Sequence, residues 1–104
     1  MLDSYNYKTL NEIIGQAVVV EDRKGNQVHL IIAEVNKGQI DGEQWEAFSV
    51  IYQGKPDFSV PQGTYKLHHQ AFGEKELFLS PNSETEYETV IARRRDAKSD
   101  VAVV

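Results

Sequence analysis

Short segments in which apolar and polar residues alternate dominate the chain. Six of them are separated by stretches rich in glycine, proline, asparagine and aspartate: residues 16–21, 27–35, 45–52, 64–71, 75–80 and 86–93. Alternation with a period of two is typical of strands with one buried face. Six strands about 8–12 residues apart, joined by short turns, predict an antiparallel sandwich or barrel. No strand–helix–strand spacing is present, which excludes a parallel sheet.

Several of these segments are apolar on both faces. Residues 18–20 and 77–79 are apolar triplets, so one face can line a barrel and the other must meet a helix, another sheet or a second subunit. We favour a closed or nearly closed six-stranded barrel, because closure removes exposed edge strands. In residues 27–35 the alternation predicts one face of Val28, Leu30 and Ile32 and an opposite face of Ile31, Ala33 and Val35.

One short helix is predicted near the start of the chain. Thr9 and Glu12 have the spacing of a capping box, with Thr9 at the N-cap. Gly15 then supplies the end of the helix. Three apolar residues between these signals share one helical face: Leu10, Ile13 and Ile14. The pattern lasts less than two turns, so the helix must pack on the sheet.

Composition limits the class of protein. The chain has 104 residues and a net charge of −5, is 40% hydrophobic and contains no cysteine. We expect one domain over residues 1–95 and a flexible C-terminal tail over 96–104. The lack of cysteine excludes disulfide scaffolds, thiol nucleophiles and iron–sulfur clusters.

Charge and hydropathy also restrict partners and location. The acidic balance argues against nucleic acid, and the arginine triplet at 93–95 lacks the interleaved aromatics of a nucleic-acid footprint. Neither a secretory signal pattern nor a membrane-length apolar stretch is present. The sequence therefore predicts a cytoplasmic protein without a membrane or nucleic-acid partner.

The chain carries an ordered set of motifs: FSVIYQG at 48–54, PQGTYKLHH at 61–69, FG at 72–73, LFLSP at 77–81 and a late Tyr87. This set resembles a small bacterial domain family of unknown function. The resemblance covers residues 7–95. This sequence departs from the family pattern at Lys55, at Phe72 and at residues 91–93. The resemblance implies an all-β fold, no assigned activity, and neighbours that resemble phage-tail-type fibre proteins.

Histidines are the first candidates for chemistry. His68 and His69 are adjacent in a predicted strand, so they point to opposite faces and cannot chelate one ion side by side. A metal site built from two histidines, His29 included, with Glu34 or Glu76 is the alternative considered. We favour an inward His69 that is hydrogen-bonded to backbone or to Tyr65, because buried polar groups are normally satisfied. We therefore expect no metal ion and no cofactor.

Catalytic patterns are missing from the sequence. The serines lie outside any Gly-x-Ser-x-Gly context, and the glycines are scattered at turns and form no phosphate-binding loop. Glu84, Glu86 and Glu88 alternate, which is typical of a solvated strand face. We expect no enzyme activity; a base role for His69 is the third hypothesis.

Binding candidates lie in loops and at strand ends. The irregular stretch 53–63 carries Phe58, which either plugs a barrel end or anchors a partner, and Gln62, which we expect to fix the loop by bonding its backbone. Trp45 is a further contact candidate or is covered by the helix. The apolar residues 101–104 are candidates for adding as a strand to a neighbour's edge.

Two functions remain from this reasoning. The first is a non-catalytic interaction or assembly module that binds another protein or itself. The alternative is a small-ligand-binding barrel with a pocket near Tyr65, His69 and Phe78, which a fully packed interior would exclude.

Overall fold

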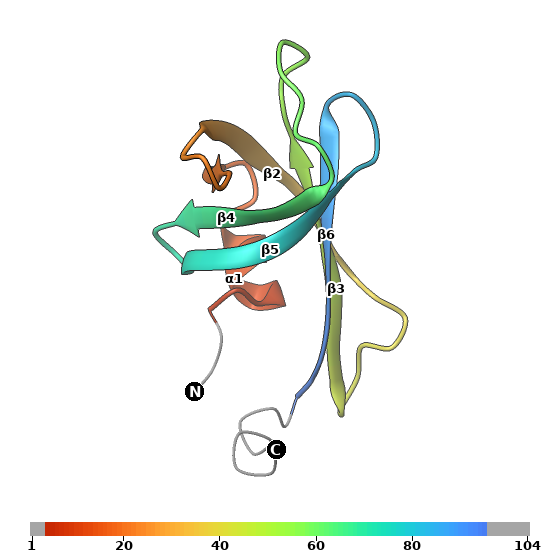
Figure 1. The fold of residues 1–104 in the computed structure, drawn as a ribbon. Helices are drawn as coiled ribbons and strands as arrows, with labels where there is room; N and C mark the ends of the chain where they lie inside the picture. Colours follow the sequence, from red (N-terminus) through yellow and green to blue (C-terminus); the bar gives the residue numbers. More distant parts are fainter. Residues whose placement is uncertain (1–3, 96–104) are drawn as a thin grey trace.

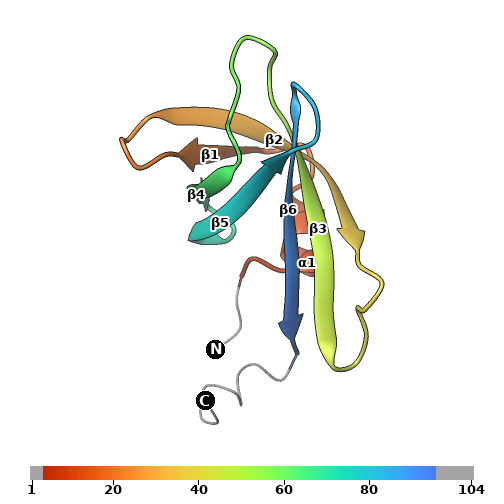
Figure 2. The ribbon, with the colours of Figure 1, turned by 45° about the vertical axis from the view of Figure 1, so that its right-hand side comes forward.

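The six predicted strands close into one antiparallel barrel. In the computed structural model, which describes residues 4–95, the strand order around the barrel is β1-β2-β3-β6-β5-β4 (Figures 1 and 2). The elements are α1 (Tyr7–Glu12), β1 (Ala17–Glu21), β2 (Gln27–Lys37), β3 (Trp45–Gln53), β4 (Gly63–His69), β5 (Gly73–Pro81) and β6 (Glu86–Arg94). The predicted fold class is confirmed. The expected C-terminal tail, with its apolar residues 101–104, lies outside the described residues.

Two three-stranded meanders make the barrel. β1, β2 and β3 follow one another as hairpins, as do β4, β5 and β6, and the crossing loop 54–62 joins the two sets. The sets meet at β1–β4, where Val20 is opposite Leu67, and at β3–β6, where Tyr52 is opposite Tyr87. Closure gives every strand two neighbours, which is the solution to exposed edges that the sequence favoured.

Inward residues from all six strands fill the barrel. They form one contiguous cluster with the helix and the loops. Its fully buried members from the strands are Val18, Val20, Leu30, Ile32, Phe48, Val50, Tyr52, Leu67, Leu79 and Tyr87. One polar side chain among the described residues is as deeply buried, that of Thr89. Since neighbouring positions on most strands are exposed, the alternation in the sequence reports the barrel's inside and outside.

A β-bulge corrects the predicted faces of β2. The register between β2 and β3 shifts between Ile32 and Glu34, so one extra residue, Ala33, stands in β2. An extra residue reverses the alternation beyond it. Val35 is therefore buried with Ile32, whereas the sequence placed it on the opposite face with Ile31.

The helix begins earlier than the sequence indicated. Asn6, not Thr9, is the N-cap: its side-chain Oδ1 accepts a hydrogen bond from the backbone N–H of Thr9 at 2.8 Å. Thr9 lies inside the helix, and the predicted capping box is wrong. Gly15 does mark the exit, because its φ of +95° is a conformation that disfavours residues with a Cβ. Its N–H donates to the carbonyl of Ile32, which ties the exit to β2.

Aromatic side chains from the N-terminal segment close one end of the barrel. Tyr5 is buried, its ring contacts the edge of Phe72 with centroids 5.0 Å apart, and its hydroxyl lies 2.5 Å from that of Tyr52. Burial is the main cause that raises the pKa of Tyr52 well above its ordinary value, and the nearby Tyr5 adds to this increase. Leu10 of α1 packs into the same cluster. This N-terminal plug was not predicted.

The crossing loop closes the other end. Val60 is buried, and its backbone N–H donates to the hydroxyl of Tyr87 at 3.0 Å. Gly54 lies where Leu30, Tyr87 and Phe58 converge, and a Cβ built on it would be 3.0–3.3 Å from each of them. Buried side chains thus reach both ends of the barrel among the residues that the structure describes.

Candidate functional site

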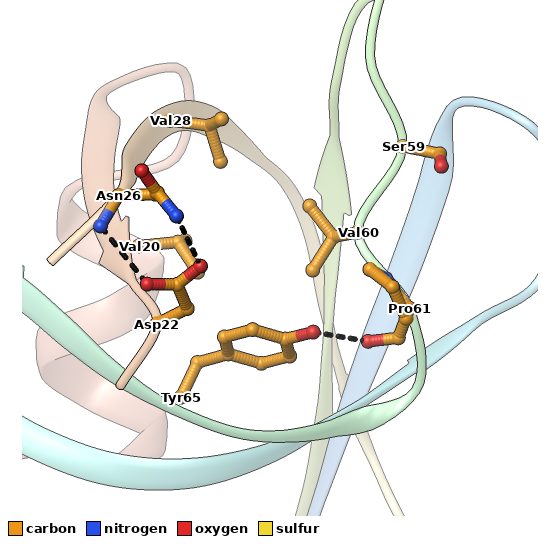
Figure 3. A pocket seen from close by; sticks show the side chains of 8 residues that line it. All are labelled: Val20, Asp22, Asn26, Val28, Ser59, Val60, Pro61 and Tyr65. Atoms are coloured by element: carbon orange, nitrogen blue, oxygen red, sulfur yellow. Dashed lines mark hydrogen bonds between the residues drawn. The ribbon is translucent and has the colours of Figure 1, made fainter. Parts of the chain in front are cut away.

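A small pocket lies at the barrel end that the crossing loop covers. Its volume is about 150 Å³, and it lies between the β1–β2 hairpin and that loop (Figure 3). The lining residues are Val20, Asp22, Asn26, Val28, Ser59, Val60, Pro61 and Tyr65. The three valines form an apolar floor, and Tyr65 extends along one side toward Pro61 (Figure 3).

Hydrogen bonds within the pocket use its polar groups. Asp22 Oδ1 accepts the backbone N–H groups of Lys24 and Asn26, and Oδ2 accepts the Asn26 side-chain amide at 3.0 Å. The side-chain bond from Asn26 is the main cause that holds the pKa of Asp22 below its usual value. The Tyr65 hydroxyl donates to the carbonyl of Pro61 at 2.6 Å. These bonds hold the hairpin and the loop in place, and a ligand would meet a lining that is partly apolar and partly polar.

Tyr65, His69 and Phe78 do not share a cavity. Tyr65 lines the pocket at the start of β4, whereas His69 is the last residue of that strand. Phe78 is 50% exposed, between the inward residues Leu77 and Leu79. The sequence therefore indicated Tyr65 as a candidate but did not predict the group of residues that lines this pocket. The turn sequence from Asp22 to Asn26, where Asp22 bonds the following backbone, is the signal in the sequence that marks its rim.

The ring of His69 is held by a structural arrangement. Its Nδ1 accepts the backbone N–H of Ala71 at 2.8 Å, and its Nε2 lies 2.9 Å from Oε1 of Gln16. Because Nδ1 accepts a hydrogen bond, Nε2 carries the ring proton and donates a hydrogen bond to Oε1 of Gln16. The ring also stacks on Phe72 with centroids 5.7 Å apart. Both nitrogens are therefore engaged in holding the β4–β5 turn.

Outward histidines flank β1. His29 on β2 and His68 on β4 are both opposite Val19 in the register, on its two sides. Their backbones therefore stand two strand spacings apart, about 10 Å. Among residues 4–95, no group of three histidine, aspartate or glutamate side chains is placed to hold a metal ion.

Loop and strand-end candidates have separate surroundings. The half-buried Phe58 packs against the core beside Gly54, as a plug of the barrel end does. Gln62 is exposed, and the bond that fixes the loop comes from Tyr65. Trp45 is 37% exposed, so it is not fully covered, and the Arg94 guanidinium lies 5.8 Å from its ring centroid.

β5 and β6 meet over a short length only. We call this contact the seam: in the described chain, the two strands pair at Ser80–Glu88 and Pro81–Tyr87 and then diverge (Figure 2). Beyond it, the Thr89 hydroxyl donates to the carbonyl of Phe78 at 3.1 Å, where a strand pair would have used a backbone N–H. Thr89 is 2% exposed, so its side chain completes the wall where the ladder ends.

Two large apolar side chains lie outside this seam. Phe78 on β5 and Val90 on β6 both point outward, and Val90 is 71% exposed. Continuing the seam's register by two residues would place them opposite each other. We call Phe78, Val90 and the small Ala92 the seam patch. Val90 and Ala92 were missed at the sequence level, because residues 84–88 made this strand face appear uniformly acidic.

These observations define the class of protein: a small closed antiparallel β-barrel domain with a packed interior. The chain belongs to the family described as a domain of unknown function, DUF6916, whose sequence model matches residues 5–91. This confirms the expected relationship to a family of that kind. Neither the curated proteins nor the solved structures that were compared contain a match. Within residues 4–95, the helix is too short to cross a membrane.

Proposed function

We propose that this domain is a non-catalytic protein-interaction module. The observation that carries the proposal is the seam patch, where Phe78 and Val90 are 50% and 71% exposed on neighbouring strands. Adjacent exposed large apolar side chains are typical of protein-binding surfaces. The inward-facing groups are already packed or hydrogen-bonded, and no buried side-chain polar atom of the described residues lacks a partner.

Cross-linking from the patch tests this function. A photoreactive amino acid in place of Val90 or Phe78 should give discrete protein adducts in the native cell, since a bound partner covers these positions. Lys24, exposed in the β1–β2 turn, is the control position. Excess wild-type domain should suppress the adducts, whereas excess Val90→Lys domain should not. Equal labelling from Lys24, or no adduct from the patch, would contradict the proposal.

The pocket beside Tyr65 favours one second candidate, a site for a small ligand with an apolar group. Its apolar floor and volume of about 150 Å³ fit a fragment of about one ring. Titration with phenol, followed by amide NMR signals of Val20, Val28 and Val60, should then show saturable shifts. Val60→Trp should fill the space and abolish them. Shifts that rise linearly without saturation would remove this candidate.

The expected link to phage-tail-like assemblies stays a prediction from the resemblance. Such a link would say in which assembly the interaction module acts, and the proposed binding surface would remain the seam patch. Identification of the cross-linked protein as a component of a fibre-bearing particle would support it, and identification of an unrelated protein would contradict it.

A further inference from the structure

We propose that the pocket beside Tyr65 binds a free α-amino acid that has an apolar side chain. The inference rests on the small-ligand function proposed for this pocket and names the class of ligand. A second space of about 480 Å³ lies next to the pocket, at the turn of the β1–β2 hairpin and the first residues of β4. Asp22, Asn26 and Tyr65 line both spaces, so one ligand can reach from one into the other.

The apolar part of the site fits one side chain. Val20 and Val60 are 2% and 6% exposed, and Val28 is half-buried. They come from the hairpin and from the crossing loop and lie on two sides of the pocket (Figure 3). A volume of about 150 Å³ accepts a branched aliphatic or a benzyl group, such as the side chains of leucine and phenylalanine. An apolar lining with a few polar groups that fix orientation is typical of small-molecule sites.

One carboxylate oxygen of the pocket is able to accept a further hydrogen bond. Asp22 Oδ1 accepts two backbone N–H groups, from Lys24 and Asn26, whereas Oδ2 accepts one bond, from the Asn26 side chain at 3.0 Å. Each carboxylate oxygen accepts about two bonds, so Oδ2 keeps one acceptor position. The lowered pKa of Asp22, caused mainly by the Asn26 side-chain bond, keeps this carboxylate ionised at neutral pH. A ligand ammonium group matches the position, because hydrogen bonds between charged partners are stronger than neutral ones.

Two cationic side chains adjoin this acceptor. Arg23 and Lys24 line the second space together with Asp22. An amine alone would bring its positive charge beside the two cations, and a carboxylic acid alone would bring its negative charge beside Asp22. An α-amino acid carries both charges on the carbon that bears its side chain. It can therefore place its ammonium at Asp22 and its carboxylate toward Arg23 and Lys24 while the side chain lies over the valines. The three neighbouring environments thus favour a zwitterion over a singly charged ligand.

Three ligands with the same ring separate these contributions. L-Phenylalanine carries both charges, phenethylamine lacks the carboxylate, and 3-phenylpropionate lacks the ammonium. Each is titrated into the wild-type domain at neutral pH and followed by the amide NMR signals of Val20, Val28 and Val60. Phenylalanine should saturate at a concentration about tenfold lower than either analogue, because each analogue loses one charged hydrogen bond. This comparison uses no substitution, so it does not depend on whether a variant folds.

Variants then assign the charges to residues. Asp22→Asn should weaken phenylalanine binding about tenfold and leave 3-phenylpropionate binding unchanged or stronger. Arg23→Gln combined with Lys24→Gln should weaken phenylalanine binding and leave phenethylamine binding unchanged or stronger. The side chain introduced by Asp22→Asn still offers an oxygen to the two backbone N–H groups of the turn, and the melting temperature of each variant is measured alongside. Glu43→Gln and Lys8→Gln, which remove exposed charges outside both spaces, are the matched controls.

The outcomes separate the ligand class from the function of the pocket. If phenol saturates but phenylalanine binds no more tightly than its two analogues, the ligand class is wrong and the small-ligand function stands. If neither phenol nor any of the three ligands saturates, both are overturned. Variants that weaken all three ligands equally also overturn the ligand class, because recognition of charge must depend on the charge of the ligand. Cross-linking from the seam patch tests the interaction module independently.

Discussion

Gly54 is the position where the packing of the barrel end can be tested most sharply. A Cβ added there would lie 3.0 Å from Leu30 Cδ2, 3.2 Å from Tyr87 Cε2 and 3.3 Å from Phe58 Cε1. Leu30 and Tyr87 are buried, and the Tyr87 hydroxyl accepts the Val60 N–H, so neither ring nor methyl has free space to retreat into. Gly54→Ala therefore requires these three side chains to move by a few tenths of an ångström.

The expected cost follows from two opposing terms. Extra methyl groups in a packed core cost about 1–3 kcal/mol, and a glycine-to-alanine change recovers about 0.4–1 kcal/mol from the unfolded chain. Gly54→Ala should thus lower the free energy of unfolding by about 1–2 kcal/mol. In a domain of this size each kcal/mol lowers the melting temperature by about 4–8 °C.

Gly63 provides the matched control. A Cβ there would be 3.7 Å from the Tyr65 ring, an ordinary contact, and its φ is not in the left-handed region. Gly63→Ala should leave stability unchanged or raise it by about 0.4–1 kcal/mol. Urea unfolding followed by circular dichroism measures both variants. If Gly54→Ala is as stable as the wild type, or if both variants change equally, the packing argument for the crossing loop is wrong.

Three further perturbations address the seam, the buried tyrosine and the helix cap. Thr89→Val should cost about 1–3 kcal/mol because it leaves the Phe78 carbonyl without its donor, whereas Thr89→Ser keeps the bond; equal losses in urea unfolding would contradict this role. The raised pKa of Tyr52 means that the unfolded state releases its proton first, so the free energy of unfolding should fall as the pH rises above about 10, by at most about 1.4 kcal/mol per pH unit. Tyr52→Phe should flatten this dependence, and an unchanged slope would show that another group causes it. Asn6→Ala should cost about 1 kcal/mol through the lost cap and Thr9→Ala clearly less; the reverse order in thermal melts would restore Thr9 as the cap.

Strand positions and barrel closure could be predicted because they follow from local signals. Apolar residues at alternate positions, such as Phe48, Val50 and Tyr52, predict a strand with one buried face. Glycine and asparagine residues between these segments predict the turns. Two-faced triplets such as 77–79 pointed correctly to apolar side chains on the outside, and Phe78 is one of them.

Other features depend on geometry that no short window of sequence contains. The bulge at Ala33 turned Val35 inward, and a bulge has no composition of its own. Asn6 and Thr9 are both good capping residues, and the choice was decided by Tyr5, which must reach Tyr52 inside the barrel. The length of the seam depends on where β5 leaves β6, which is a property of the whole barrel. Residue type alone gave the candidate site residues, and their positions in space depend on the fold. They do not form one site: Trp45, Phe58, Gln62, Tyr65 and His69.

The arrangement of the two meanders has a consequence for folding and local opening. Neither set of three strands can pair the backbone hydrogen-bonding groups of its outer strands by itself. β1 requires β4 and β3 requires β6, and these partners are far apart in sequence. Such non-local pairing makes folding slow and couples both halves into one cooperative transition. The seam is the exception, since two residue pairs hold it. Native-state hydrogen exchange should therefore be fastest across β5 and β6 near Phe78, where the barrel can open without unfolding.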